Sequence, residues 1–252
     1  MNLLYSFSIV CYQLLLRLVA LWHPKAKLLN DGRKETFKIL AQNPSTSNKR
    51  YWFHCASLGE YDMALPLIEA CVAADPTVEI VVSFYSPSGM QHFYKRGFVP
   101  HAVFYLPADL PSSMKHLVQK VGASRLYLLK YEFWPYLLRA AQNASVEVLS
   151  VSTLLRPSQV YFKWYGAFFR NALQRVSYFR LRQGADADQQ GARAFRQGRS
   201  RRRSAACSKW VALCARRWAP RWGASTSSFT TSPTTSGPTV SVTSCRCSLP
   251  SA

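Results

Sequence analysis

The chain has 252 residues, of which 48% are hydrophobic, and its 32 Lys and Arg side chains against 12 Asp and Glu give a formal net charge of +20. This length and apolar content are enough for one large or two modest hydrophobic cores. The seven cysteines form no C-x-x-C pair, which argues against a zinc site or a disulfide framework and favours a reducing compartment.

The first predicted element is an apolar helix over residues 1–23. Its length is near the roughly 20 residues that span a bilayer, but Gln13 and Arg17 interrupt it. No basic segment precedes it, so a cleaved signal peptide is not expected. Lys and Arg residues follow it, which by the positive-inside rule favours a cytoplasmic body. The pattern fits a membrane anchor or an interfacial helix, with a helix packed on a soluble domain as the alternative.

Residues 24–179 alternate between strand-like and helix-like segments. Strand patterns occupy residues 51–57, 78–86, 102–107, 125–133 and 146–152, and helical patterns lie between them. This alternation predicts a Rossmann-like α/β domain, in which helices cover both faces of a parallel sheet. Ligands of such sheets bind at the carboxyl ends of the strands. Four loops qualify here, at residues 56–60, 86–89, 106–111 and 130–135.

Glu60 stands directly after Gly59, where the first strand pattern gives way to a helical one. With Ser57 it matches the S-x-x-E capping box, in which the acid stabilises the start of a helix. The same position would let the carboxylate point into a cleft at the end of the strand. The spacing favours capping, and the two roles are compatible.

Three further groups of residues could take part in binding or catalysis. The segment 86–89, SPSG, could bind a phosphate or carboxylate through backbone N–H groups, or form an ordinary turn. The charged residues at 130–132 end an apolar strand, where charges are usually paired or functional. His54 and Cys55 suggest a nucleophile with its base, but adjacent strand residues face opposite sides, so we interpret His54 as a packed residue. The sequence contains no GxGxxG, Walker or metal-ligand spacing.

The composition changes at about residue 180. Residues 180–252 hold 13 Lys and Arg against two Asp, and they end in Ser/Thr/Pro-rich sequence without apolar periodicity, so we expect disorder. Such a bias is typical of a gene translated out of frame. The alternative is a genuine basic tail that binds nucleic acid or an anionic surface through residues 199–203.

Five segments occur in the order known from one family. They read WFHCASLGEYDMALPLIEA, SFYSPSGM, VFYLPADLPSSMKHLV, KYEFWPYLL and VYFKWYGAFFRNAL. Together they resemble the N-terminal half of the 3-deoxy-D-manno-octulosonate (Kdo) transferases of Gram-negative bacteria, especially those of Bacteroidetes, up to about Phe179. Lys130 departs from the family pattern, because an acid usually stands there. The family's C-terminal Rossmann domain, which holds most of the CMP-Kdo site, has no recognisable counterpart.

The resemblance implies the N-terminal domain of a two-domain GT-B glycosyltransferase at the cytoplasmic face of the inner membrane. The implied reaction is an inverting transfer of Kdo from CMP-Kdo to a lipid A precursor, lipid IVA, with no metal, no other cofactor and no nucleic-acid partner. We expect a chain that is frameshifted or truncated after about residue 179 and inactive as written. The alternative is a membrane-associated basic protein that binds nucleic acid or anionic lipid through its Arg-rich tail.

The resemblance also implies roles for individual residues. Glu60 corresponds to the proposed general base, which takes the proton from the attacking acceptor hydroxyl. Glu132 corresponds to a second essential acid with a positioning or electrostatic role. The remaining expected substrate contacts are the cleft-shaping Ser57, Gly59, Ser86, Ser88 and Gly89 and the anion-binding Lys130, Arg156 and Lys163.

Overall fold

The computed structural model describes residues 2–153, 158–181 and 244–246. Its helices are α1 (Asn2–Val19), α2 (Pro24–Gln42), α3 (Leu58–Ala74), α4 (Pro87–His92), α5 (Pro111–Val121), α6 (Pro135–Asn143) and α7 (Ala167–Leu173), with the short 3-10 turns η1 (Phe93–Arg96) and η2 (Val160–Phe162). Its strands are β1 (Arg50–Cys55), β2 (Glu79–Phe84), β3 (Ala102–Tyr105), β4 (Arg125–Leu129), β5 (Glu147–Thr153), β6 (Tyr178–Leu181) and β7 (Ser244–Arg246). Strand and helix alternate from β1 to α6, which confirms the predicted α/β domain.

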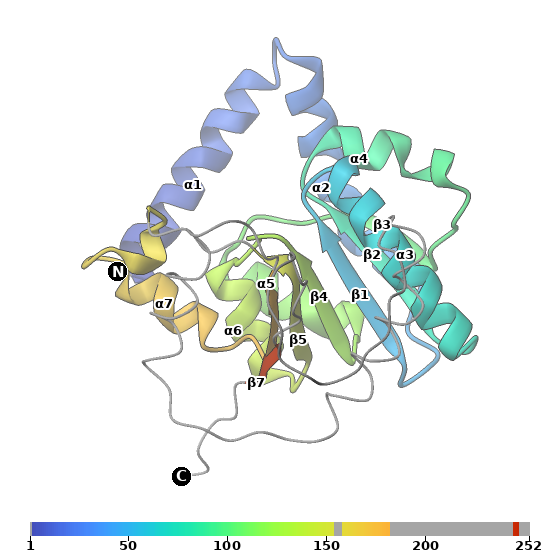
Figure 1. Ribbon diagram of the computed structural model, residues 1–252. Helices are drawn as coiled ribbons and strands as arrows, with labels where there is room; N and C mark the ends of the chain where they lie inside the picture. Colours follow the sequence, from blue (N-terminus) through green and yellow to red (C-terminus); the bar gives the residue numbers. More distant parts are fainter. Residues whose placement is uncertain (1, 154–157, 182–243, 247–252) are drawn as a thin grey trace, which may run out of the picture.

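The strands form one sheet in the order β3-β2-β1-β4-β5-β6-β7, and β1 to β6 run parallel. The chain proceeds from β1 outward to β3 and then crosses back, so that β4 lies on the other side of β1 (Figure 1). The strand order therefore reverses between β1 and β4, and the loops that leave these two strands run in different directions along the sheet. Open α/β sheets bind ligands at such reversals of strand order.

The last strand, β7, lies within the segment for which we expect disorder. The backbone of Ser244–Arg246 pairs antiparallel with β6, with Cys245 opposite Phe179. Without this partner β6 would be an edge strand, whose unpaired N–H and C=O groups accept any extended segment. The expected disorder and frameshift otherwise concern residues 182–243 and 247–252, which lie outside the described residues.

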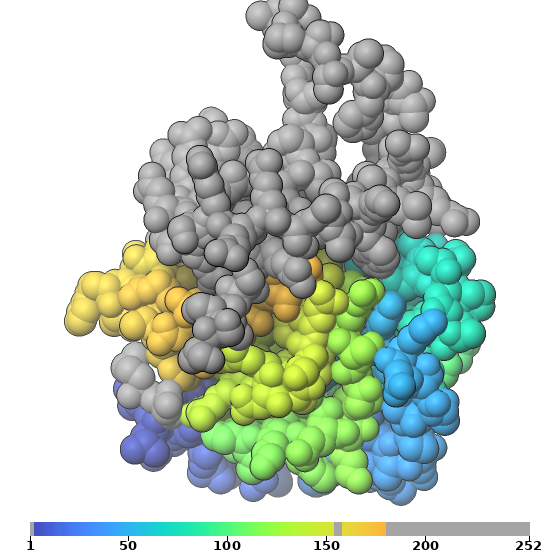
Figure 2. All heavy atoms as spheres, turned by 90° about the horizontal axis from the view of Figure 1, so that it is seen from below, coloured from blue at the N-terminus to red at the C-terminus, as the bar shows by residue number. Residues whose placement is uncertain are grey.

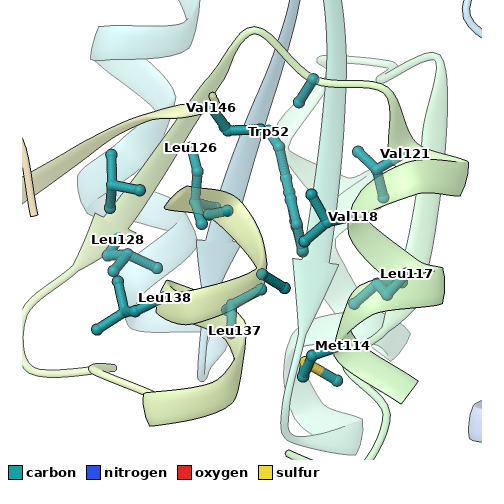
Figure 3. Packing of buried hydrophobic residues seen from close by; sticks show 14 of the residues in the cluster. Trp52, Met114, Leu117, Val118, Val121, Leu126, Leu128, Leu137, Leu138 and Val146 are labelled. Carbon is teal, nitrogen blue, oxygen red and sulfur yellow. The ribbon is translucent and has the colours of Figure 1, made fainter. Parts of the chain in front are cut away.

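Each face of the sheet buries its own apolar cluster, because successive strand residues point to opposite sides. On one face Trp52 lies among side chains of α5 and α6, including Val118 and Leu137 (Figure 3). On the other face Phe53 stacks on Tyr127 of β4, with ring centroids 4.4 Å apart, beneath α3. The two central strands are thus held from both sides, and the loops that follow them start from fixed positions.

Helices α1 and α2 form an inverted V beside the sheet (Figure 1). α2 packs along β3: Thr36 Oγ1 donates to the Tyr105 carbonyl at 2.8 Å, and a Cβ at Gly32 would come within 2.2 Å of the Tyr105 ring. The start of α1 rests on α7, where the Tyr5 and Phe168 ring centroids are 5.3 Å apart. In Figure 2 the start of the chain, in dark blue, lies at the same side of the molecule as the yellow and orange segment that contains α7. Both helices are therefore part of the domain.

Among the described residues, no helix has both the length and the apolar character needed to cross a membrane. The expected spanning anchor over residues 1–23 is therefore not found. α1 has 18 residues, and polar side chains tie it to the domain. The Tyr5 hydroxyl donates to Asp109 at 2.9 Å, and the Ser6 and Tyr136 hydroxyls are 2.7 Å apart. The interfacial alternative stays a prediction.

Candidate functional site

Glu60 and Lys130 meet at the carboxyl ends of β1 and β4. Glu60 lies in the first turn of α3 and is only 6% exposed. One carboxylate oxygen, Oε2, accepts the backbone N–H of Ala56 at 2.5 Å, and the other, Oε1, lies 3.8 Å from Nζ of Lys130. The reversal of strand order therefore brings together a buried acid and a lysine that are 70 residues apart in the sequence.

The predicted capping box forms only in part. Ser57 is the N-cap residue of α3, but its side chain makes no capping hydrogen bond to the described residues. Glu60 reaches past Ser57 and accepts the N–H of Ala56 instead. The acid thus satisfies a backbone donor at the start of the helix, as expected of a capping residue, while its second oxygen faces the β4 loop.

The surroundings of Glu60 make it a stronger base than an ordinary glutamate. Burial is the largest influence and raises the pKa of the carboxyl group. The Ala56 hydrogen bond lowers the pKa, the negative charge of Glu132 raises it, and Lys130 and His54 lower it, with a net increase. A raised pKa increases the affinity of the carboxylate for a proton, which favours general-base chemistry.

Glu132 accepts a hydrogen bond from Trp134 and lies near His54. The indole Nε1 of Trp134 donates to Oε2 of Glu132 at 3.0 Å, and Nε2 of His54 lies 3.8 Å from the same oxygen. His54 is fully buried, and its Nδ1 is 2.9 Å from the Ser83 hydroxyl, which also accepts the indole N–H of Trp52 at 2.7 Å. The Ser83 hydrogen can then be donated to Nδ1, which places the proton of a neutral imidazole on Nε2, toward Glu132.

His54 is fully buried, as expected of a packed residue. Its Nε2 is buried without a hydrogen-bond partner among the described residues. Cys55 does not act with it: burial, and then the charges of Glu60 and Glu132, raise the pKa of the thiol, so the thiolate is disfavoured. This agrees with the rejection of a Cys/His nucleophile, while the position of His54 behind Glu132 could not be read from the sequence.

Lys130 has a left-handed backbone conformation, with φ of 59°. This conformation costs a non-glycine residue of order 1 kcal/mol and is concentrated at functional sites. The turn is fixed by the Lys130 N–H, which donates to the Val151 carbonyl at 3.0 Å. Where the resembled family usually has an acid, this chain therefore presents a cation to Glu60.

The SPSG segment, residues 86–89, lies beside the loop that follows β1. The Ser86 N–H donates to the Ala56 carbonyl at 2.9 Å, and the hydroxyls of Ser86 and Ser88 are 2.9 Å apart. Gly89 is buried, and a Cβ there would come within 2.3 Å of the Phe84 ring. Close packing of α4 on β2 therefore accounts for this glycine, and the two serines are the members of the segment next to the site.

The three remaining predicted residues are Gly59, Lys163 and Arg156. Gly59 is exposed, and no described atom lies within 4 Å of a Cβ built on it, so its surface is open to a ligand. Lys163 follows η2, and its carbonyl accepts Nη1 of Arg170 at 2.6 Å. Within the described ranges no hydrogen bond or ion pair joins Lys163 to either acid. Arg156 lies outside the described residues.

Aromatic side chains beside the acids were not predicted. Tyr85, directly after β2, stacks on Trp134 with ring centroids 5.2 Å apart and an interplanar angle of 22°. Burial, and then the charge of Glu132, raise the pKa of Tyr161 to about 12, so this phenol stays neutral near the acid. Tyr85 and Trp134 both occupy loops at the carboxyl ends of strands, which is the signal that could have identified them.

In the part of the chain that the structure describes, no group of three or more His, Cys, Asp or Glu side chains is placed to hold a metal ion. What the site offers is a buried carboxylate of raised pKa, a second acid bonded to Trp134 and close to His54, and one lysine. This arrangement suits proton removal from a bound hydroxyl group.

Comparison with known proteins gives one consistent result. A model of the family described as 3-deoxy-D-manno-octulosonic-acid transferase (kdotransferase) matches residues 31–201, which confirms the resemblance and extends it beyond residue 179. Proteins named 3-deoxy-D-manno-octulosonic acid transferase are 26% identical over 195 residues in Bordetella pertussis, 24% over 135 residues in Haemophilus influenzae and 29% over 133 residues in Chlamydophila psittaci.

These matches cover 72%, 53% and 52% of this chain, but only 44%, 31% and 30% of the respective relatives. The chain therefore spans less than half the length of the curated relatives that it matches. The residues matched by the family model include Glu60, Lys130 and Glu132.

Proposed function

The chain belongs to the 3-deoxy-D-manno-octulosonic-acid transferase family, and from this premise we propose that the described domain binds the acceptor of a Kdo transfer and supplies its general base. The donor would be CMP-Kdo, the acceptor a lipid A precursor such as lipid IVA, and the stereochemical course inverting. The observation that carries this proposal is the burial of Glu60, with a raised pKa, at the point where the strand order of the sheet reverses.

In the proposed reaction a sugar hydroxyl of the acceptor attacks the anomeric carbon of Kdo. A new carbon–oxygen bond forms as the bond to the CMP phosphate breaks, and the electron pair of that bond leaves with CMP. The hydroxyl proton passes to the Glu60 carboxylate, which burial makes more basic. Inversion follows if the hydroxyl attacks the face opposite to CMP.

The neighbours of Glu60 adjust its basicity in opposite directions. The charge of Glu132 raises the pKa of Glu60, and the ammonium group of Lys130 lowers it. Trp134 holds Glu132 through a hydrogen bond, and Nε2 of His54 lies 3.8 Å from the same oxygen. Glu132 is therefore proposed to act through charge and position, while Lys130 keeps Glu60 ionised and available as a base. Ser57, Ser86 and Ser88 stay candidates for acceptor contacts.

The same proposal places the protein on the cytoplasmic face of the inner membrane, as the first domain of a GT-B enzyme. It is supported by the outer face of α1, where Leu3, Phe7 and Leu14 are 87%, 66% and 52% exposed. An apolar helix face next to a basic segment fits an interfacial helix at an anionic membrane.

The test is a transfer assay with two proteins. The first is a chimera in which residues 1–181 replace the matching segment of the Bordetella pertussis relative; the second is the 252-residue chain. We expect the chimera to transfer Kdo from CMP-Kdo to the lipid A precursor, with transfer lost in its Glu60→Gln variant and acceptor binding kept. Full activity of a folded Glu60→Gln chimera would remove Glu60 from its role.

The 252-residue chain is expected to be inactive, so clear Kdo transfer by it would contradict that expectation. The rival function, binding of nucleic acid or anionic lipid by the Arg-rich tail, concerns residues 199–203, which lie outside the described residues. It stays a sequence-based alternative, tested by removal of residues 182–252 and by the salt dependence of binding.

A further inference from the structure

The structure has a concave surface whose lining does not include Glu60. It is a cleft of about 580 Å³ between α1, α2 and the loop after β3, of the size that holds small ligands. We call it the α1–α2 cleft and define it by the side chains that carry its polarity: Gln13, Arg17, Lys27, Arg33 and Lys34. Its wall is mainly basic, which gives it a different chemistry from the acid pair at β1 and β4.

Arg33 is the central residue of the α1–α2 cleft. It is only 8% exposed, and its guanidinium carbon lies 4.9 Å above the Tyr85 ring. Nη1 donates to the Gln13 side chain at 3.3 Å, but Nε and Nη2 have no hydrogen-bond partner among the described residues. A guanidinium group cannot lose its charge, and a buried cation needs an anionic partner. Arg33 is thus buried against an aromatic ring and an amide, and no ion pair joins it to an acid that the structure describes.

The charges around Arg33 do not supply an anionic partner. Asp31 is the acid in the lining, and it pairs with Lys34 at 3.0 Å. Arg17 and Lys27 line the cleft and form no ion pair with any residue that the structure describes. The cleft thus combines three uncompensated cations, of which Arg33 is buried.

The outer face of α1 indicates where an anion would come from. Leu14 and Leu18 of α1 are 52% and 56% exposed, and Leu21, in the turn after α1, is 72% exposed and lines the α1–α2 cleft. Arg17 stands among them in the sequence and faces the cleft. An anion held by Arg33 would therefore sit beside an apolar helix face, which suits the headgroup and the chains of one amphiphile.

We propose that the α1–α2 cleft binds the phosphate group of a membrane lipid, with Arg33 as its buried anchor and Arg17 and Lys27 at its rim. The planar guanidinium fork matches the oxygens of a phosphate, which can accept two N–H bonds at once. The occupant is a lipid phosphate, preferably a phosphomonoester, whose exposed oxygens reach further into the cleft than those of a diester.

The α1–α2 cleft is connected to the candidate catalytic site by direct contacts. Arg33 lies over Tyr85, Tyr85 stacks on Trp134, and Trp134 donates to Glu132. A lipid whose phosphate binds Arg33 would hold the rest of its headgroup toward the acids. That this lipid is the acceptor rests on the proposed function; that the cleft binds a lipid phosphate does not.

The experiment measures vesicle binding by the full chain and does not involve transfer. Phosphatidylcholine vesicles carry either phosphatidic acid, a phosphomonoester, or phosphatidylglycerol, a diester, at equal surface charge and physiological ionic strength. The variants are Arg33→Gln and the double variant Arg17→Gln/Lys27→Gln, which changes only exposed side chains. Lys120→Gln removes the same charge from an exposed position on α5 and serves as the control.

We expect the wild-type chain to prefer the phosphomonoester vesicles. Arg33→Gln should lower that affinity by about tenfold, the typical effect of losing hydrogen bonds to a charged group. The double variant should weaken binding in the same direction, Lys120→Gln should keep the preference, and melting curves should show all variants folded. If the Arg33→Gln variant does not fold, the vesicle preference of the double variant tests the proposal in its place.

Equal binding of both vesicle types by the wild-type chain would overturn the proposal, as would a preference that survives in the Arg33→Gln and double variants. Melting curves with inorganic phosphate test the source of the anion. Stabilisation of the wild type by free phosphate, without a vesicle preference, would overturn the lipid assignment. Absence of Kdo transfer by the chimera, with an intact vesicle preference of the full chain, would count against the proposed function alone.

Discussion

The two ends of the parallel sheet both bury charged side chains, but they satisfy them differently. At the amino ends, Nε of Arg50 donates to Glu79 at 2.6 Å, and the Arg50 guanidinium also donates to the carbonyls of Asn43 and Pro44. Glu79 further accepts the Thr46 N–H at 3.1 Å. At the carboxyl ends, the Lys130–Glu60 and His54–Glu132 contacts are both 3.8 Å long.

The difference separates a structural ion pair from a site. Because the donors and acceptors around Arg50 and Glu79 are bonded within the protein, that pair has no capacity for a ligand, and it fixes the start of β1 and β2. At the other end Nε2 of His54 is buried without a partner in the described structure, and Glu60 has one close hydrogen bond. Long ion contacts can be replaced by contacts to a substrate.

The first two predictions replace a buried glutamate by glutamine, once at each end of the parallel sheet. In the chimera, Glu60→Gln should lower Kdo transfer by roughly 10²- to 10⁴-fold, the usual contribution of a general base. The melting temperature should change little, because burial of the ionised Glu60 is already unfavourable, as its raised pKa indicates. Initial rates and melting curves measure the two effects.

Glu79→Gln should lower the stability of the protein and leave acceptor binding unchanged. Loss of this carboxylate leaves the Arg50 guanidinium buried without its counter-charge, which typically costs roughly 3 to 5 kcal/mol of unfolding free energy. Denaturant titration measures this loss, and acceptor binding by the folded fraction should be unchanged. Equal stability losses for Glu60→Gln and Glu79→Gln would remove the distinction between the two ends.

Asp109 is a third buried acid, and its surroundings differ from those of Glu60 and Glu79. It accepts the Tyr136 N–H at 3.1 Å, the Leu137 N–H at 2.9 Å and the Tyr5 hydroxyl, so it caps α6 from the loop after β3 and ties α1 to it. Asp109→Asn leaves one of these donors unsatisfied and should cost about 1 to 3 kcal/mol. Thermal unfolding followed by circular dichroism measures the loss.

The pH dependence of Asp109 gives a control for this prediction. Burial raises the pKa of the carboxyl group from 3.8 to about 6, against the opposing effect of its three hydrogen bonds. Because the folded state binds the proton more tightly, folding takes up a proton between these values, and the contribution of Asp109 to stability falls as pH rises from about 4 to 6. In Asp109→Asn this part of the pH dependence should disappear.

Lys130→Gln should have the smallest effect. The ammonium group lowers the pKa of Glu60, so its removal should raise that pKa further. Transfer by the chimera requires ionised Glu60, and the acidic limb of its pH–rate profile should therefore move to higher pH, with the activity at the optimum nearly kept. An acidic limb that moves to lower pH, or does not move, would contradict the Lys130–Glu60 contact.

The sequence was sufficient for those parts of the molecule that depend on local patterns. Apolar periodicity predicted the alternating strands and helices, because side-chain direction repeats every two residues in strands and about every 3.6 in helices. It also placed Glu60, the SPSG segment and Glu132 in loops after strands. The resemblance supplied the family, which the family model confirmed over residues 31–201.

The tertiary structure decided which of these loops meet. That β4 pairs with β1 depends on packing between segments far apart in the chain, which no local period encodes, and it is this pairing that sets Lys130 beside Glu60 and His54 behind Glu132. The same holds for Arg33, a basic residue like its neighbours in the sequence. Only the packing of α2 buries it over Tyr85 without an anion among the described residues.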